Sequence, residues 1–133
     1  MASQLKVDTI TGVTTAGSIS VTGEGNSTTT NLQQGLVKMW MQIDQSSFGV
    51  LDSLNVSSAS DDGTGLFTVT RSNNMNNSNY GVATAVMSDR VGILGSNGNT
   101  YTTSQNNFTN NDSRDASYHD PSRNGIILTG DLA

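Results

Sequence analysis

The chain lacks cysteine, contains a single proline and is poor in charged residues. The absence of cysteine excludes disulfide bonds and thiolate metal sites. Charged residues make up 13% of the 133 residues, about half of the usual ~25%. The net charge is −5, whereas a protein that binds a phosphate backbone needs clustered Lys and Arg. The sequence therefore predicts no nucleic-acid partner.

Long apolar runs are missing as well. The longest uninterrupted runs have about four residues, far fewer than the ~20 that a membrane-spanning helix needs. The first ten residues, MASQLKVDTI, have no apolar segment of the kind found in a secretory signal. We therefore expect neither membrane insertion nor a signal peptide.

Residues that favour helices are scarce. Glu24 is the only glutamate, and Lys6 and Lys38 are the only lysines. Ser, Thr and Asn together number about 50, well above an average chain, and they favour turns and strands. Only 33% of the residues are hydrophobic, which predicts a thin core for a lone domain. Oligomerisation would bury additional surface between copies.

Residues 1–30 are predicted to form an extended N-terminal arm. Short apolar alternations in this region are interrupted by four glycines, and they supply too few apolar residues for a core. We expect the arm to become ordered by packing on another chain, the alternative being a disordered N-terminus. The candidate anchoring residues of the arm are Leu5, Val7, Ile10 and Val13.

Residues 31–133 are predicted to form one β domain. The segment NLQQG can make a single helical turn, and residues 37–43 alternate with period two. Both faces of that strand carry large apolar groups near Trp40, which suits either a subunit interface or the centre of a sandwich. The candidate interface residues are Trp40, Met39 and Met41.

The rest of the chain alternates between short strands and turns. DDGTG separates two β runs and predicts a hairpin, and Asn97-Gly98 is a strong signal for another. Further strands are expected over 80–86, over 90–94 and at the C-terminus. Residues 104–125 are polar and are expected to form a long loop. The predicted fold is all-β: a small antiparallel β-sandwich-like domain.

Motifs for catalysis or metal binding are weak. SDDGTG lacks the spacing of a calcium loop, no Gly-x-Ser-x-Gly elbow is present, and the lone His119 cannot build a multi-histidine metal site. We expect no enzyme, metal or cofactor, although a carboxylate pair shared between subunits stays open. Sugar binding is the best functional hypothesis for the polar residues after Gly95, against a solubilising loop. The candidate glycan contacts are Tyr101, Phe108, Tyr118 and Asn107, beside Asn106, Asn110 and Asp112.

One stretch resembles a module of tailed phages that infect marine bacteria. The matching residues run from Asn31 to Gly35, then Lys38, Trp40, Ile43 and Asp44, then Asp52 to Ser58, Asp62 to Gly65, Met75 and Tyr80. The resemblance covers roughly residues 3–86. It departs from the family pattern at Gln45-Ser46-Ser47, where Gly-Thr-Gly is common, and the chain has no shaft repeats.

The resemblance implies a virion structural protein that is β-rich and trimeric. Such a protein would act as a tail fibre or tail appendage in particle assembly and host attachment. Its N-terminal segment would contact other virion proteins of the tail or capsid, and its distal domain a host surface glycan or protein. The alternatives are a capsid decoration or cement protein and a small carbohydrate-binding module or sugar-acting enzyme.

Overall fold

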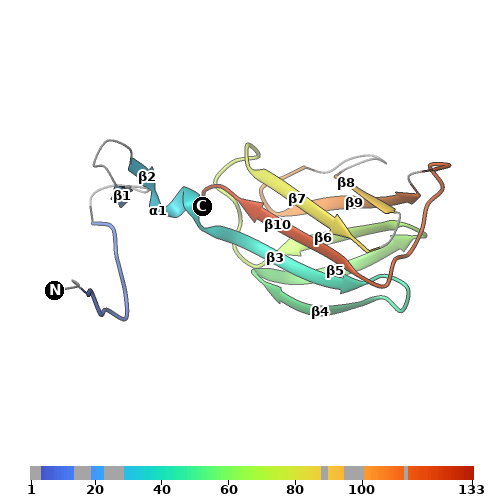
Figure 1. Ribbon diagram of the computed structural model, residues 1–133, viewed down its shortest axis with the longest axis horizontal. Coiled ribbons are helices and arrows are strands. Elements are labelled where there is room, and N and C mark those ends of the chain that lie inside the picture. Colours follow the sequence, from blue (N-terminus) through green and yellow to red (C-terminus); the bar gives the residue numbers. More distant parts are fainter. Residues whose placement is uncertain (1–3, 14–18, 23–28, 88–89, 95–100, 113) are drawn as a thin grey trace.

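The computed structural model describes residues 4–13, 19–22, 29–87, 90–94, 101–112 and 114–133. Two four-stranded antiparallel sheets pack face to face as a sandwich (Figure 1). The first sheet has the order β4-β3-β10-β7, with bounds Gly49–Leu54, Val37–Asp44, Asn124–Thr129 and Gly81–Val86. The second sheet has the order β5-β6-β9-β8, with bounds Val56–Gly63, Leu66–Arg71, Gln105–Asp112 and Arg90–Leu94. The all-β, sandwich-like prediction is confirmed.

Short elements precede the sandwich and lie beyond one of its ends (Figure 1). Strands β1 (Ser20–Thr22) and β2 (Thr29–Asn31) form a separate antiparallel pair. The predicted helical turn is α1 (Leu32–Gly35), and the side chain of Asn31 caps it by accepting from the Gln34 N–H at 3.1 Å. Among the described residues, no helix is long and apolar enough to cross a membrane.

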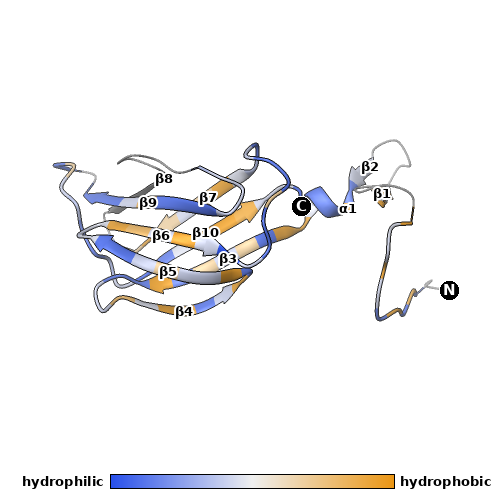
Figure 2. Ribbon diagram, turned by 180° about the vertical axis from the view of Figure 1, so that it is seen from behind, coloured by the Kyte–Doolittle hydropathy of each residue, from blue (hydrophilic) through white to orange (hydrophobic). Residues whose placement is uncertain are grey.

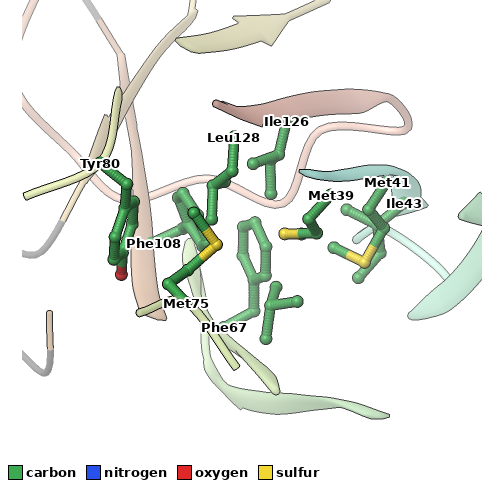
Figure 3. Packing of buried hydrophobic residues seen from close by; sticks show 10 residues of the cluster. Met39, Met41, Ile43, Phe67, Met75, Tyr80, Phe108, Ile126 and Leu128 are labelled. Atoms are coloured by element: carbon green, nitrogen blue, oxygen red, sulfur yellow. The ribbon is translucent and has the colours of Figure 1, made fainter. Parts of the chain in front are cut away.

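The apolar core lies between the two sheets (Figure 3). Strands β3 and β10 supply Met39, Met41, Ile43, Ile126 and Leu128 from one layer, and β6 and β9 supply Phe67, Val69 and Phe108 from the other. The rings of Phe67 and Phe108 stack with their centroids 5.3 Å apart. The buried cluster consists of Met39, Met41, Ile43, Phe67, Val69, Met75, Tyr80, Phe108, Ile126 and Leu128.

The expected long loop over 104–125 is wrong in its first half, because residues 105–112 form β9 in the middle of the second sheet. The strand is mostly hydrophilic (Figure 2), yet Asn106, Phe108 and Asn110 are buried. Amide side chains take apolar positions here because they find partners. The Asn110 Nδ2 donates to Gln45 Oε1 at 2.6 Å.

The chain changes sheets at Asn55. The sequence suggests one alternating run through Leu54 and Val56, but the structure places Leu54 in the first sheet and Val56 in the second. Asn55 lies between them with a φ of 60°, a left-handed conformation that Asn tolerates better than most residues. Its Nδ2 donates to the carbonyls of Lys38 and Asn73, and its Oδ1 accepts from the Asn73 N–H.

The β5–β6 hairpin turn at DDGTG is confirmed. Gly63 and Gly65 have φ values of 123° and 70°, and Asp61 Oδ1 accepts from the Gly63 N–H at 3.0 Å. Gly65 also lies so close to β9 that an added Cβ would be 2.7 Å from the Asn110 carbonyl oxygen. The second predicted hairpin, at Asn97-Gly98, lies outside the described residues.

Candidate functional site

An apolar hollow lies on the outer face of the first sheet, the face turned away from the core. Trp40 pairs with Leu54 on β4 and with Ile127 on β10, which in turn pairs with Ala83 on β7. This row crosses all four strands. The neighbouring row consists of Asp52, Gln42, Gly125 and Ala85. We call these eight residues the Trp40 face.

The hollow has a volume of about 300 Å³ and exists because small residues surround a large one. Gly125 contributes no side chain and Ala83 and Ala85 contribute one carbon each, whereas the half-buried Trp40 is the largest side chain on the face. The side chains of Ile127 and Leu54 remain 45% and 47% exposed. Aromatic anchors beside pockets are typical of binding surfaces, and contiguous exposed apolar residues mark interaction sites. The lining consists of Trp40, Met41, Gln42, Ala83, Thr84, Ala85, Gly125, Ile126 and Ile127.

The predicted interface residues separate onto two faces of β3. Trp40 lies on the outer face, as an interface residue would. Met39 and Met41 are 1% exposed and belong to the core of their own domain, so their assignment to a subunit interface is wrong. The physical reason is the pleat: neighbouring side chains of a strand point to opposite faces, so Trp40 cannot share a surface with either methionine.

The predicted anchoring residues are exposed and do not pack against the rest of the described chain. Residues 4–13 form no helix or strand, and Leu5 and Val13 are 81% and 94% exposed. Val7 and Ile10 are exposed as well. The segment therefore presents four apolar side chains to its surroundings, and the burial that would stabilise them has to come from elsewhere.

The four candidate glycan contacts do not converge on one surface. Phe108 is 2% exposed and stacks on Phe67 in the core, so it cannot contact a ligand. Tyr118 is exposed and pairs with Asn111 through an isolated bridge. Asn107 lies on the outer face of the second sheet, paired with Thr68.

Tyr101, the fourth candidate, packs against the core residue Tyr80. Its ring stacks on Tyr80 with centroids 4.5 Å apart, and its hydroxyl donates to the Tyr80 carbonyl at 2.5 Å. Burial raises the pKa of the Tyr101 phenol, and the neighbouring Tyr80 adds to that rise. These contacts make Tyr101 a packing residue with one exposed edge.

Beneath these tyrosines lies a buried arginine that the sequence did not reveal. Arg71 is 3% exposed, and its guanidinium donates to Asn106 Oδ1, to the carbonyls of Thr102 and Thr103 and to the Tyr80 hydroxyl. Each of these acceptors is neutral. The guanidinium ties β6 to β9 and to the turn before it, and Arg at the end of an apolar alternation was the only sequence signal for it.

A polar depression of about 290 Å³ lies on the outer face of the second sheet. Asp62 lines it and accepts hydrogen bonds from the hydroxyls of Ser60 and Thr68. Asn107 also lines it, and its Oδ1 has no partner in the described residues. The sequence placed Asp62 in a turn and Asn107 in a loop, so their meeting depends on the pairing of β5, β6 and β9.

The group around His119 does not form a catalytic triad. Ser117 Oγ is 3.0 Å from His119 Nε2, and a carboxylate oxygen of Asp112 lies 4.0 Å from that same nitrogen. A triad needs the carboxylate on the other ring nitrogen to orient the base. Ser117 Oγ instead donates to Asp115 at 2.6 Å. Among the described residues, no cluster of three acidic, histidine or cysteine side chains is arranged to hold a metal ion.

Comparisons with known proteins add no relative: no protein-family model, no curated protein and no solved structure matches this chain.

Proposed function

We propose that this chain is a structural subunit of a bacteriophage virion, working as a homotrimeric tail fibre or tail appendage in particle assembly and host attachment. The observation that carries the proposal is the Trp40 face, because its apolar hollow is suited to protein contact. Among the lining residues whose side chains point to the outer face, Gln42 alone is polar, because Thr84 pairs with the core residue Ile126 and points inward. Catalysis needs several converging polar groups, and a subunit contact does not.

The residues behind the phage resemblance support a structural role. Asn31 caps α1, Asn55 directs the chain from one sheet to the other, and Gly65 makes the β5–β6 turn. Trp40 stands on the outer face. These are positions that specify a fold and a contact surface, and a shared scaffold accounts for such a motif without a shared active site.

The exposed N-terminal segment supports the predicted arm. Leu5, Val7, Ile10 and Val13 would bind neighbouring subunits of the virion, as the apolar residues of an anchoring segment do. Under this proposal, residues 1–30 attach the subunit and residues 31–133 form the β domain.

The deciding experiment locates the protein in purified phage particles. Labelled antibody in electron microscopy and copy number from quantitative mass spectrometry give the position. Labelling at the tail with a few to a few tens of copies supports the proposal. Hundreds of copies over the head would assign the chain to capsid decoration instead, and absence from the particle would overturn both assignments.

A further inference from the structure

We infer that the Trp40 face receives residues 4–13 of a second copy of this chain. The inference rests on the proposed function as a self-assembling subunit and names the contact by which the copies join. In this arrangement the N-terminal segment of one copy fills the hollow of its neighbour, and the exposed apolar residues of the segment become buried there.

The two surfaces complement one another in shape and polarity. The segment offers Leu5 and Val7 at alternate positions, and both are exposed. The hollow has a volume of about 300 Å³. Gly125 lies at its floor, and Trp40 and Ile127 form its apolar walls. Branched aliphatic side chains fill a depression of this kind, and an extended segment can place two of them on the same side of its backbone.

Charge favours this pairing over the stacking of two sheet faces. Residues 32–133 contain nine acidic and five basic residues, so two sandwiches repel each other at long range. In the segment 4–13, Lys6 and Asp8 cancel. Docking the neutral segment on the face avoids this repulsion, whereas face-to-face stacking brings together two sandwiches that each carry a net negative charge.

The N-terminal segment does not cover the Trp40 face of its own chain, because its apolar side chains are exposed. Gln34 in α1 donates to the Asp131 carboxylate at 3.0 Å, and the Lys38 ammonium donates to the Gln33 carbonyl, so α1 is tied to the end of the sandwich. Residues 4–13 lie beyond that end (Figure 1). The segment and its own face lie apart in the structure, and the inference assigns the segment to the face of a neighbouring copy. Contacts of this head-to-tail type close into rings when the rotation permits, which accommodates a trimer.

Trp40 is the only tryptophan, so its fluorescence reports directly on the hollow. The full chain is diluted from about 100 μM to 0.1 μM while the emission maximum, the accessibility to acrylamide and the mass by sedimentation are followed. We expect the emission to shift to the red and the quenching to rise as the oligomer dissociates. Emission that stays constant while the mass changes would overturn the inference, as would a chain that is monomeric throughout.

Two variants separate the halves of the contact. Leu5→Ser/Val7→Ser removes the occupant, and Ile127→Ser removes one wall of the hollow. All three positions are exposed within their own chain, so both variants should fold. Each is expected to weaken self-association about tenfold or more. The matched control is Leu51→Ser, which removes an equally exposed leucine of β4 from outside the hollow and should leave association unchanged.

Mixing the variants gives the decisive result. A copy with Ser at positions 5 and 7 retains an intact face, and a copy with Ser at 127 retains an intact segment. A head-to-tail contact predicts that the mixture forms heterodimers at a concentration at which each variant alone is mostly monomeric. A mixture that stays monomeric would overturn the inference, because a symmetric contact cannot be restored in this way. Particle incorporation is measured separately, so loss of this contact remains distinguishable from loss of the virion role.

Discussion

Single side chains join segments that are distant in sequence, and Arg71 does so with a buried charge. Its guanidinium is surrounded by carbonyls, an amide oxygen and a hydroxyl, and it lies 5.1 Å from the centre of the Tyr80 ring. Burying a charge is costly unless hydrogen bonds satisfy it. The planar fork of arginine can donate to four acceptors at once, which lysine cannot. The network therefore depends on this side chain and on its geometry.

We expect Arg71→Met to lower the free energy of unfolding by about 3 kcal/mol, since several buried acceptors lose their donor. Urea unfolding at a fixed protein concentration measures the loss. The matched control is Arg123→Met, because Arg123 is exposed, and its effect should stay within about 0.5 kcal/mol. Equal effects of the two substitutions would contradict the structural role of Arg71.

Asp44 makes stability depend on pH at the β3–β4 turn. Hydrogen bonds from the side chains of Ser46 and Ser47 lower the pKa of its carboxyl. A lowered folded-state pKa means that the ionised form stabilises the fold at neutral pH. That contribution is lost as the pH falls through the folded-state pKa.

The pH prediction concerns the difference between the wild type and Asp44→Asn. The variant should unfold at a lower temperature at pH 7, and the gap should close as the pH falls below the ordinary pKa range of aspartate. Thermal unfolding from pH 7 to pH 2, at a protein concentration low enough to keep the chain monomeric, measures it, and Asp52→Asn, which changes an exposed carboxylate of β4, is the control. A gap that is constant across this range would show that charge plays no part.

At the scale of elements, the connection between β4 and β5 decides how the two layers are joined. β4 lies at an edge of the first sheet and β5 at an edge of the second, so the chain passes from layer to layer within one residue. This sharp change of direction requires a special backbone conformation and hydrogen bonds that hold the connection, and Asn55 supplies both. It adopts a positive φ, and its side chain binds the carbonyl of β3 and the backbone of residue 73.

Two substitutions at Asn55 separate these requirements. Asn55→Gly keeps access to the positive φ and loses the hydrogen bonds, and Asn55→Ala loses both. We expect both variants to be destabilised, with the alanine variant less stable by about 1 kcal/mol than the glycine variant. Chemical denaturation of the pair provides the measurement. If alanine were the more stable of the two, the backbone conformation would not be the limiting factor.

At the scale of the whole molecule, stability and assembly are predicted to be linked through Trp40. The half-buried Trp40 side chain stabilises the monomer only in part, and the neighbour's segment covers the remainder. Trp40→Ala should therefore cost about 2 kcal/mol in the isolated domain. Its larger effect should be on the midpoint temperature at high protein concentration, because association stabilises the folded state by mass action.

Scanning calorimetry across a hundredfold range of concentration tests this linkage. The wild-type midpoint should rise with concentration, and the midpoint of Trp40→Ala should not. A wild-type midpoint independent of concentration would separate folding from assembly and count against a homo-oligomer.

The local pattern of the sequence determined much of the fold. Period-two alternation predicted β3, β6 and β7, because side chains of a strand alternate between its faces, and the apolar C-terminal segment predicted β10. The segment NLQQG predicted the turn of α1, and the Asp-Gly pair predicted the β5–β6 hairpin. In each case the cause and the structure lie within a few residues of one another, so no distant contact was needed.

Tertiary structure alone decided which polar residues are buried and which face of β3 is free. The sequence of β9 predicted a loop because only Phe108 is apolar. Its buried asparagines are accommodated in the core by hydrogen bonds to Gln45 and Arg71, which are distant in sequence. Alternation places Trp40 opposite Met39 and Met41, but both sides of the strand are apolar. Only the packing of the second sheet against the methionines leaves Trp40 outside, because burial depends on which partner a face meets.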